Sequence, residues 1–100
     1  MIQVQEGNIY SFKMNSGEEL IGKVTKIEDD CYIVDSPLST GMTQQGMQLM
    51  PAMFTIELNA EVIISMDSVA IVGNPREDVA DAYRESTTGI KVPKKQIIMS

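Results

Sequence analysis

The stretch that decides the fold is residues 12–34, which read FKMNSGEELIGKVTKIEDDCYIV. Apolar and polar side chains alternate over residues 10–14, and this period of two predicts a half-buried strand. Gly17 supplies the positive φ angle that a tight turn needs. A second alternation starts at Leu20, so the stretch predicts two antiparallel strands joined by a tight hairpin turn.

The second of these strands contains a slip in its apolar pattern. Leu20, Gly22 and Val24 share one face of a regular strand, whereas Ile27 falls on the opposite face. A slip of one residue predicts a β-bulge or a strong bend, which we place near residues 25–26. Gly22 is consistent with such a bend, because a glycine inside a strand often marks a bend or a close backbone approach. Such a bend is what a small barrel requires.

The rest of the chain to residue 73 also has the features of short strands. Residues 36–46 are rich in Gly, Ser and Thr and predict a loop or an extended hairpin tip, and residues 67–68 predict a very short turn. Short strands with no helix among them indicate an antiparallel barrel or sandwich. The further strands predicted are residues 31–35, 47–49, 54–58, 61–66 and 69–72.

A short helix is predicted at about residues 75–86, after the last strand. Asn74 is suited to the N-cap position, and Glu77 three residues later would complete a capping box. The predicted apolar stripe of this helix consists of Val79, Ala82 and Tyr83. Residues 89–100 can be an added strand or a flexible tail, and the sequence leaves both open.

Composition indicates one small globular domain. The chain has 100 residues, of which 43% are hydrophobic, and it contains no run of about 18 apolar residues that would span a membrane. Its first residues lack the positive start and apolar core of a signal peptide. The single cysteine, Cys31, has no internal disulfide partner, so we expect a cytoplasmic protein.

Charge is distributed unevenly along the chain, whose net charge is −6. All 14 acidic residues lie at or before Glu85, whereas Lys91, Lys94 and Lys95 make the last segment basic. We therefore expect the folded body to repel nucleic acid at long range, and the tail to attract it weakly.

The residues that would carry catalysis are mostly absent. The chain has no histidine, the commonest general base near neutral pH. Cys31 therefore has no histidine partner, and it occupies a strand position where a buried structural thiol is expected. Glu28, Asp29 and Asp30 lack the alternating ligands and the glycine of a calcium loop, so we interpret them as a solvated turn. We predict no catalytic residue, no metal site and no cofactor.

Two segments resemble the motifs of the Sm/LSm family of small barrels, which includes the bacterial RNA chaperones. Residues 63–72 resemble the second motif, which joins two strands through a very short turn. Residues 14–34 resemble the first motif, with Gly17, Leu20, Gly22, Val24, Ile27 and Cys31 on its defining positions. Residues 43–51 and 74–90 are also similar to uncharacterised Sm-like proteins of tailed phages from marine bacteria.

The resemblance implies a mostly-β fold, a five-stranded, SH3-like antiparallel barrel of the Sm type. Residues 1–73 would form the barrel, and residues 74–100 would add a short helix and a basic tail to the same domain. It further implies a homo-oligomeric ring in the host cytoplasm, joined through strand edges near residues 31–36 and 53–72. Ring formation would cover edges that otherwise aggregate.

The resemblance also points to four positions around the pore of such a ring, where family members bind RNA bases. Here they are Glu28, Tyr32, Ser65 and Met66, whereas the family has Asp, Asn and Arg-Gly. Tyr32 is able to stack on a base, although its acidic neighbours favour a role in packing or at an interface.

A methionine-rich segment provides the other candidate surface. Met is flexible and polarizable, so such a segment can fill a core or form an adaptable contact surface. We predict an oligomer interface that includes Met42, Met47, Met50, Met53 and Phe54.

Three functions follow from these observations. The first is a non-enzymatic ring that acts as a scaffold or accessory protein and binds a protein, or nucleic acid weakly. The second is an RNA-binding ring of the RNA-chaperone type. The third, a small enzyme, has the least support because histidine is absent and the cysteine is single.

Overall fold

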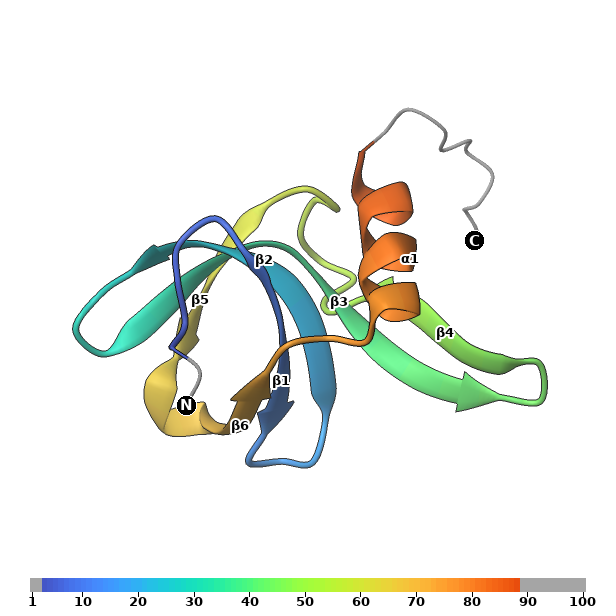
Figure 1. Cartoon of the computed structure of the whole chain (residues 1–100), viewed down its shortest axis with the longest axis horizontal. Coiled ribbons are helices and arrows are strands. Elements are labelled where there is room, and N and C mark those ends of the chain that lie inside the picture. The colour runs from blue at the N-terminus through green and yellow to red at the C-terminus, as the bar shows by residue number, and fades with distance from the viewer. Residues whose placement is uncertain (1–2, 89–100) are drawn as a thin grey trace.

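The computed structural model describes residues 3–88, which form a mostly-β domain with one α-helix (Figure 1). The predicted mostly-β class is confirmed. In chain order the elements are β1 (Ile9–Met14), β2 (Glu19–Ile27), β3 (Cys31–Thr43), β4 (Gly46–Pro51), β5 (Glu61–Ser65), the 3-10 helix η1 (Met66–Ser68), β6 (Val69–Gly73) and α1 (Glu77–Thr87).

The six strands form one antiparallel sheet that is not closed. The order is β4-β3-β2-β1-β6, and β5 pairs with β3. β5 pairs with the first part of β3 (Cys31 to Asp35), whereas β4 pairs with its last part (Leu38 to Thr43). Within residues 3–88, β4, β5 and β6 therefore each keep one unpaired edge. The prediction was a five-stranded antiparallel barrel, whereas this sheet has six strands and open edges.

The predicted hairpin of β1 and β2 is confirmed. Phe12 pairs with Leu20, and the turn between the strands contains Gly17 at φ 97°. The Gly17 backbone N–H donates to the Met14 carbonyl at 2.8 Å. The positive φ explains why glycine is needed at this position.

The bend in β2 is also confirmed. The register between β2 and β3 shifts once between Val24 and Lys26, where the apolar slip predicted it, and once more between Ile21 and Lys23. Gly22 lies within the second shift, and a Cβ atom placed there would collide with the buried side chain of Val34. Gly22 thus allows the two strands to approach closely where the sheet curls.

β3 is much longer than predicted, because it continues through Pro37 to Thr43. Residues 36–46 therefore form most of an extended hairpin, one of the two alternatives that the sequence left open. We call residues 38–51, which pair Leu38 with Pro51 through Thr43 with Gly46, the arm hairpin. Figure 1 shows this hairpin, in green, extending away from the rest of the sheet.

The strand predicted at residues 54–58 is wrong. This segment lies in a loop of turns, in which the Ala60 backbone N–H donates to the Glu57 carbonyl at 3.1 Å. Phe54 is 82% exposed and Leu58 is 58% exposed, so the alternation of apolar residues does not reflect burial. An alternating pattern forms a strand only where a partner strand is available, and here β5 already occupies the edge of β3 beyond β4.

The predicted helix is present, but its predicted cap is wrong. α1 begins at Glu77, and its N-cap, Arg76, is extended and makes no side-chain cap hydrogen bond. The Arg76 guanidinium instead binds Asp78 at 2.6 Å. The buried face contains Val79, Ala80 and Tyr83, whereas Ala82 is exposed. The alternatives for residues 89–100 concern a segment outside the described residues.

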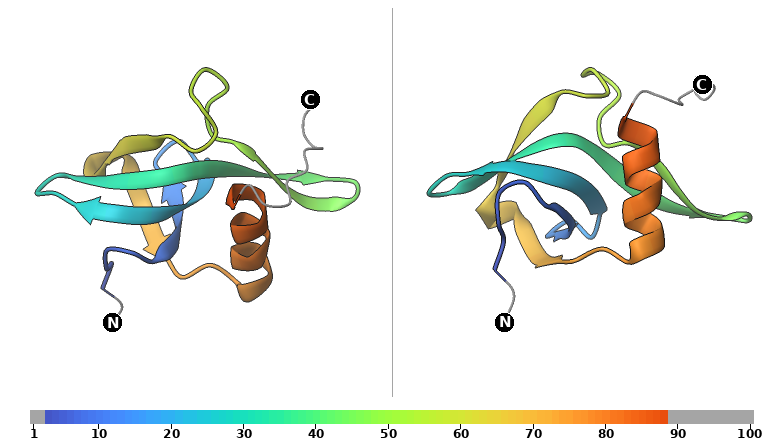
Figure 2. Two further views of the ribbon diagram at one scale, coloured as in Figure 1. Left: turned by 90° about the horizontal axis from the view of Figure 1, so that it is seen from above. Right: turned by 45° about the horizontal axis from the view of Figure 1, so that its top comes forward.

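Two core clusters lie on opposite faces of β2. The cluster that contains Ile21 and Leu38 lies under α1. There the Tyr83 hydroxyl donates to the Asp35 carbonyl at 2.6 Å and accepts from the Lys23 backbone N–H at 3.1 Å. Figure 2 shows α1 against one face of β3 and β4. The first cluster contains Tyr10, Phe12, Leu20, Val24, Val34 and Ile64, and the second contains Ile21, Leu38, Val79 and Tyr83, with Leu49 packed against it.

Candidate functional site

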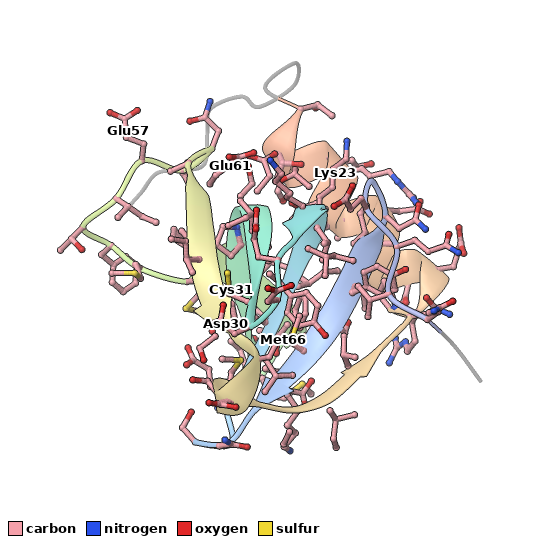
Figure 3. The ribbon with its side chains drawn as sticks, turned by 90° about the vertical axis from the view of Figure 1, so that its left-hand side faces the viewer. Lys23, Asp30, Cys31, Glu57, Glu61 and Met66 are labelled. Atoms are coloured by element: carbon pink, nitrogen blue, oxygen red, sulfur yellow. The ribbon has the colours of Figure 1, made fainter. Side chains whose placement is uncertain are left out.

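The turn between β2 and β3 and the 3-10 helix η1 lie together at one end of the sheet. The Met66 backbone N–H donates to the Asp30 carbonyl at 2.9 Å, and Cys31 pairs with Ser65. The Glu28 backbone N–H donates to the Cys31 carbonyl at 2.9 Å. We call this part, residues 28–31 and 65–67, the acidic end. Figure 3 shows Asp30, Cys31 and Met66 near one end of β5, with Glu61 near the other.

The four residues predicted to bind RNA do not all lie together in the structure. Glu28, Ser65 and Met66 meet at the acidic end, whereas the side chain of Tyr32 packs against the first core cluster. The Tyr32 and Phe12 rings lie 5.6 Å apart at 48°. The Ser65 hydroxyl accepts a hydrogen bond from the Asp67 backbone N–H at 3.2 Å, which caps η1. These contacts favour the packing role for Tyr32.

The electrostatics of the acidic end do not favour a reactive thiol. Desolvation raises the pKa of Cys31, and the neighbouring charges of Asp30 and Glu28 raise it further. The thiolate, which is the nucleophilic form, is therefore disfavoured. A buried thiol was predicted for Cys31, and the structure shows it partly buried. Among the residues that the structure describes, no group of three acidic, cysteine or histidine side chains is placed to hold a metal ion.

The residues of the predicted oligomer interface are exposed and do not fill a core. Met42 is 79% exposed and Phe54 is 82% exposed. Met42 pairs with Met47 across the arm hairpin, and both lie on the same face as Leu49, because side chains alternate along a strand. Met50 is on the opposite face, and Met53 lies beyond β4 in the loop of residues 52–60. The five residues therefore belong to more than one surface.

Two residues that sequence reasoning did not single out are prominent on the open edges. Ile63, in β5, is 73% exposed, and Ile71, in β6, is 61% exposed. Each of these residues lies in a short run of consecutive apolar residues, 62–64 or 69–72, so the sequence does not show which side chain faces solvent. Only the register, which pairs Ile33 with Ile63 and Lys13 with Ile71, places both on the outer face of the sheet.

A groove of ≈ 350 Å³ lies between β4 and α1. Its apolar part comes from both elements, and the ion pair of Arg76 with Asp78 contributes balanced charges. The lining residues are Met47, Leu49, Arg76, Asp78, Val79, Ala82 and Ser86.

No helix within residues 3–88 has the length and apolar character needed to cross a membrane. No protein-family model and no curated protein sequence matches this chain.

Proposed function

We propose that this protein is an Sm-like subunit that forms a homo-oligomeric ring and acts without catalysis, as a scaffold or accessory binding protein. The observation that carries the proposal is the pair of open strand edges on β5 and β6. Each edge strand carries an exposed isoleucine, Ile63 on β5 and Ile71 on β6. Unpaired strand edges with apolar side chains promote aggregation unless another chain covers them.

The two edges suit a head-to-tail contact. β5 and β6 follow one another through η1 and end different parts of the same sheet, so β5 of one subunit can pair with β6 of the next. Such a contact joins two different surfaces and is heterologous. When the rotation between subunits closes, a heterologous contact produces a ring.

The topology supports the resemblance to the Sm family. The first motif corresponds to a hairpin that leads into the bent β2, and the second motif corresponds to two strands separated by η1. Under this proposal the five strands of an Sm-type barrel are β1, β2, β3, β5 and β6. The additional strand, β4, pairs with the last part of β3 to form the arm hairpin.

A non-enzymatic role is supported by the chemistry of the side chains. The chain has no histidine, and the pKa of its single thiol is raised. A reducing cytoplasm, such as that of a phage host, suits a protein whose single cysteine is unpaired.

A second candidate function, RNA binding, rests on the acidic end. There the structure brings together Glu28, Ser65 and Met66, three of the four positions implied by the resemblance. Glu28, Asp29, Asp30 and Asp67 are exposed at the same end and would repel phosphates. RNA-binding rings would hold short oligoribonucleotides with an affinity that falls as salt rises, whereas the scaffold would bind them weakly at most.

The ring is tested by placing a charge on each open edge. Ile63→Glu and Ile71→Glu should each convert the oligomer into smaller species in native mass spectrometry, because a carboxylate would have to lose water in the contact. Leu58→Glu is the matched control, since Leu58 is similarly exposed but lies in the loop. Oligomers of unchanged size in both edge variants would contradict the proposal.

Mixing the two variants tests the head-to-tail arrangement. The Ile63→Glu protein keeps an intact β6 edge, and the Ile71→Glu protein keeps an intact β5 edge. Their mixture should therefore form an assembly that contains both variants in equal number, joined by the one intact contact, which neither variant forms alone. A contact made of two copies of the same edge would not produce this pairing.

A further inference from the structure

Within residues 3–88 the outer edge of β4 is the third open edge, and it lacks the usual protection. Natural edge strands are commonly blunted by charged side chains, but no residue between Asp35 and Glu57 is charged. This uncharged stretch contains the whole arm hairpin. It includes no proline between Pro37 and Pro51, so the backbone of β4 is able to pair until Pro51 ends it.

The groove beside this edge is lined by both apolar and polar side chains, and its charges are balanced. Met47 and Leu49 face α1, where Val79 and Ala82 contribute from the helix. Met42, the cross-strand partner of Met47, is 79% exposed, so the apolar face of the arm hairpin is only partly covered. In Figure 2 the arm hairpin extends past α1, which leaves this part of its face open.

Charge indicates what covers this surface. The chain has a net charge of −6, so two copies repel one another wherever their acidic surfaces meet. The arm hairpin itself carries no charge, and in the groove beside it the Asp78 carboxylate is paired with Arg76, so two copies can approach here with little repulsion. A basic partner would instead gain more from the acidic surfaces elsewhere. The uncharged edge and the neutral groove therefore favour a second copy of this chain.

We propose that the arm hairpins of two copies pair, with β4 antiparallel to β4 about a two-fold axis at Gln48. Gln48 is the middle residue of the five that precede Pro51 in β4, and it is exposed. This register places Met47 of each copy opposite Leu49 of the other. Since a two-fold contact uses the same surface twice, both edges are covered at once.

The pairing also brings the two grooves together. A two-fold axis perpendicular to the joined sheet keeps both α1 helices on the same face. The exposed Ala82 positions then lie toward each other above one continuous layer of Met and Leu side chains. This contact goes beyond the proposed ring, because it uses β4 and not β5 or β6. Where both contacts form, rings pair face to face and the number of subunits is even.

Site-directed cross-linking tests the two-fold axis directly. In a Cys31→Ser background, Gln48→Cys places identical thiols about 5 Å apart between their Cβ atoms, as expected for residues directly opposite in a sheet. Oxidation or a short bismaleimide should give a covalent dimer. The control, Gln45→Cys in the same background, is exposed at the hairpin tip but lies beyond the paired residues. Equal cross-linking at both positions, or none at Gln48→Cys, would overturn the proposal.

Ala82→Glu tests the groove without disturbing the fold, because Ala82 is exposed on a helix. It should halve the native mass, whereas Ser16→Glu, which adds the same charge in the β1–β2 turn, should not. The edge variants Ile63→Glu and Ile71→Glu should abolish the ring but keep the Gln48→Cys cross-link, so the two proposals fail separately. The pairing would be overturned if the Ala82→Glu assembly had the same mass as wild type. It would also be overturned if the mass halved only after residues 89–100 had been removed, because either result would assign the groove to another occupant.

Discussion

The side chains of the first core cluster come from the strands and are all buried, whereas the second cluster is covered by α1 and then continues into the open arm hairpin. Phe12, Val24 and Val34 in the first cluster are at most 1% exposed. In the second cluster Ile21 is fully buried, yet Met42 on the same arm face as Leu38 is 79% exposed.

This difference gives the two clusters different roles: the first stabilises the fold, and the second leaves a surface available for binding. A closed cluster stabilises the fold because burial of its side chains is complete within one chain. A cluster that is half covered leaves apolar surface that another molecule can bury. Substitutions in the first cluster should therefore change the free energy of unfolding, and substitutions at the open end of the second should change assembly.

The largest effect is expected for Phe12→Ala. Removing this ring leaves a cavity in the first cluster and deletes the contact with Tyr32, so the free energy of unfolding should fall by about 4 kcal/mol. Urea denaturation followed by far-ultraviolet circular dichroism measures it. Phe12→Leu, which keeps most of the volume, should cost much less. A small loss for Phe12→Ala would mean that the first cluster is not the main source of stability.

Gly22→Ala should have the next largest effect, about 3 kcal/mol, because overpacking forces rigid neighbours to move. Val34 is fully buried and branched at Cβ, so it cannot turn away easily from the added methyl group. Gly41→Ala is the control, since only the end of the flexible Met50 side chain lies near its Cβ position. Equal stability for Gly22→Ala and wild type would contradict the close approach of β2 and β3.

The first cluster is where the sequence was most informative. The alternation over β1 and β2, the turn at Gly17 and the slip after Val24 are local signals, and each appears in the structure. The strand predicted at residues 54–58 failed because an alternating pattern carries no information about partner strands. The capping box failed because the chain stays extended as far as Arg76, and the helix therefore begins at Glu77, two residues later than predicted.

Tyr83→Phe should have an intermediate effect, about 2 kcal/mol. The substitution removes the hydrogen bond to the Asp35 carbonyl and leaves the Lys23 backbone N–H without its acceptor. The loss should be concentrated in α1, because these two bonds attach the helix to the sheet. Hydrogen exchange should show faster opening of α1 with little change in β1. Uniform loss of protection throughout the domain would contradict a separately attached helix.

The same residue predicts a dependence of stability on pH. Burial raises the pKa of Tyr83 to about 12 from an ordinary value of 10.0. Since the folded pKa is higher, the stabilisation is complete below pH 10 and is lost as pH rises through 12, by on the order of 2 kcal/mol. Wild type should lose this much more than Tyr83→Phe between pH 10 and 12. Parallel pH curves for the two proteins would contradict the burial of the hydroxyl.

The smallest effect on stability is expected for Met42→Ser. An exposed side chain at the open end of the arm hairpin contributes little within one chain, so unfolding should change by less than about 0.5 kcal/mol. The control is Leu38→Ala, which opens a cavity in the second cluster and should cost about 3 kcal/mol. A loss for Met42→Ser as large as that for Leu38→Ala would show that the second cluster is closed.

The candidate surfaces were only partly predictable from sequence. The uncharged, methionine-rich segment indicated an interface, but the faces of the arm hairpin depend on the pairing of Met42 with Met47. Ile63 and Ile71 were not identified because each lies in a run of consecutive apolar residues, which does not show which side chain faces solvent. Tyr32 does not join Glu28 at the acidic end because its ring packs on Phe12, a contact between distant parts of the chain.

Native mass spectrometry of the full chain, purified without nuclease treatment, tests the central claim of assembly through open edges most directly. The account predicts one closed oligomer with an even number of subunits and no nucleic-acid mass. A defined oligomer that carries nucleic acid would favour the RNA-binding ring instead of the scaffold. A monomer at micromolar concentration would contradict the account, because all three open edges would then remain uncovered.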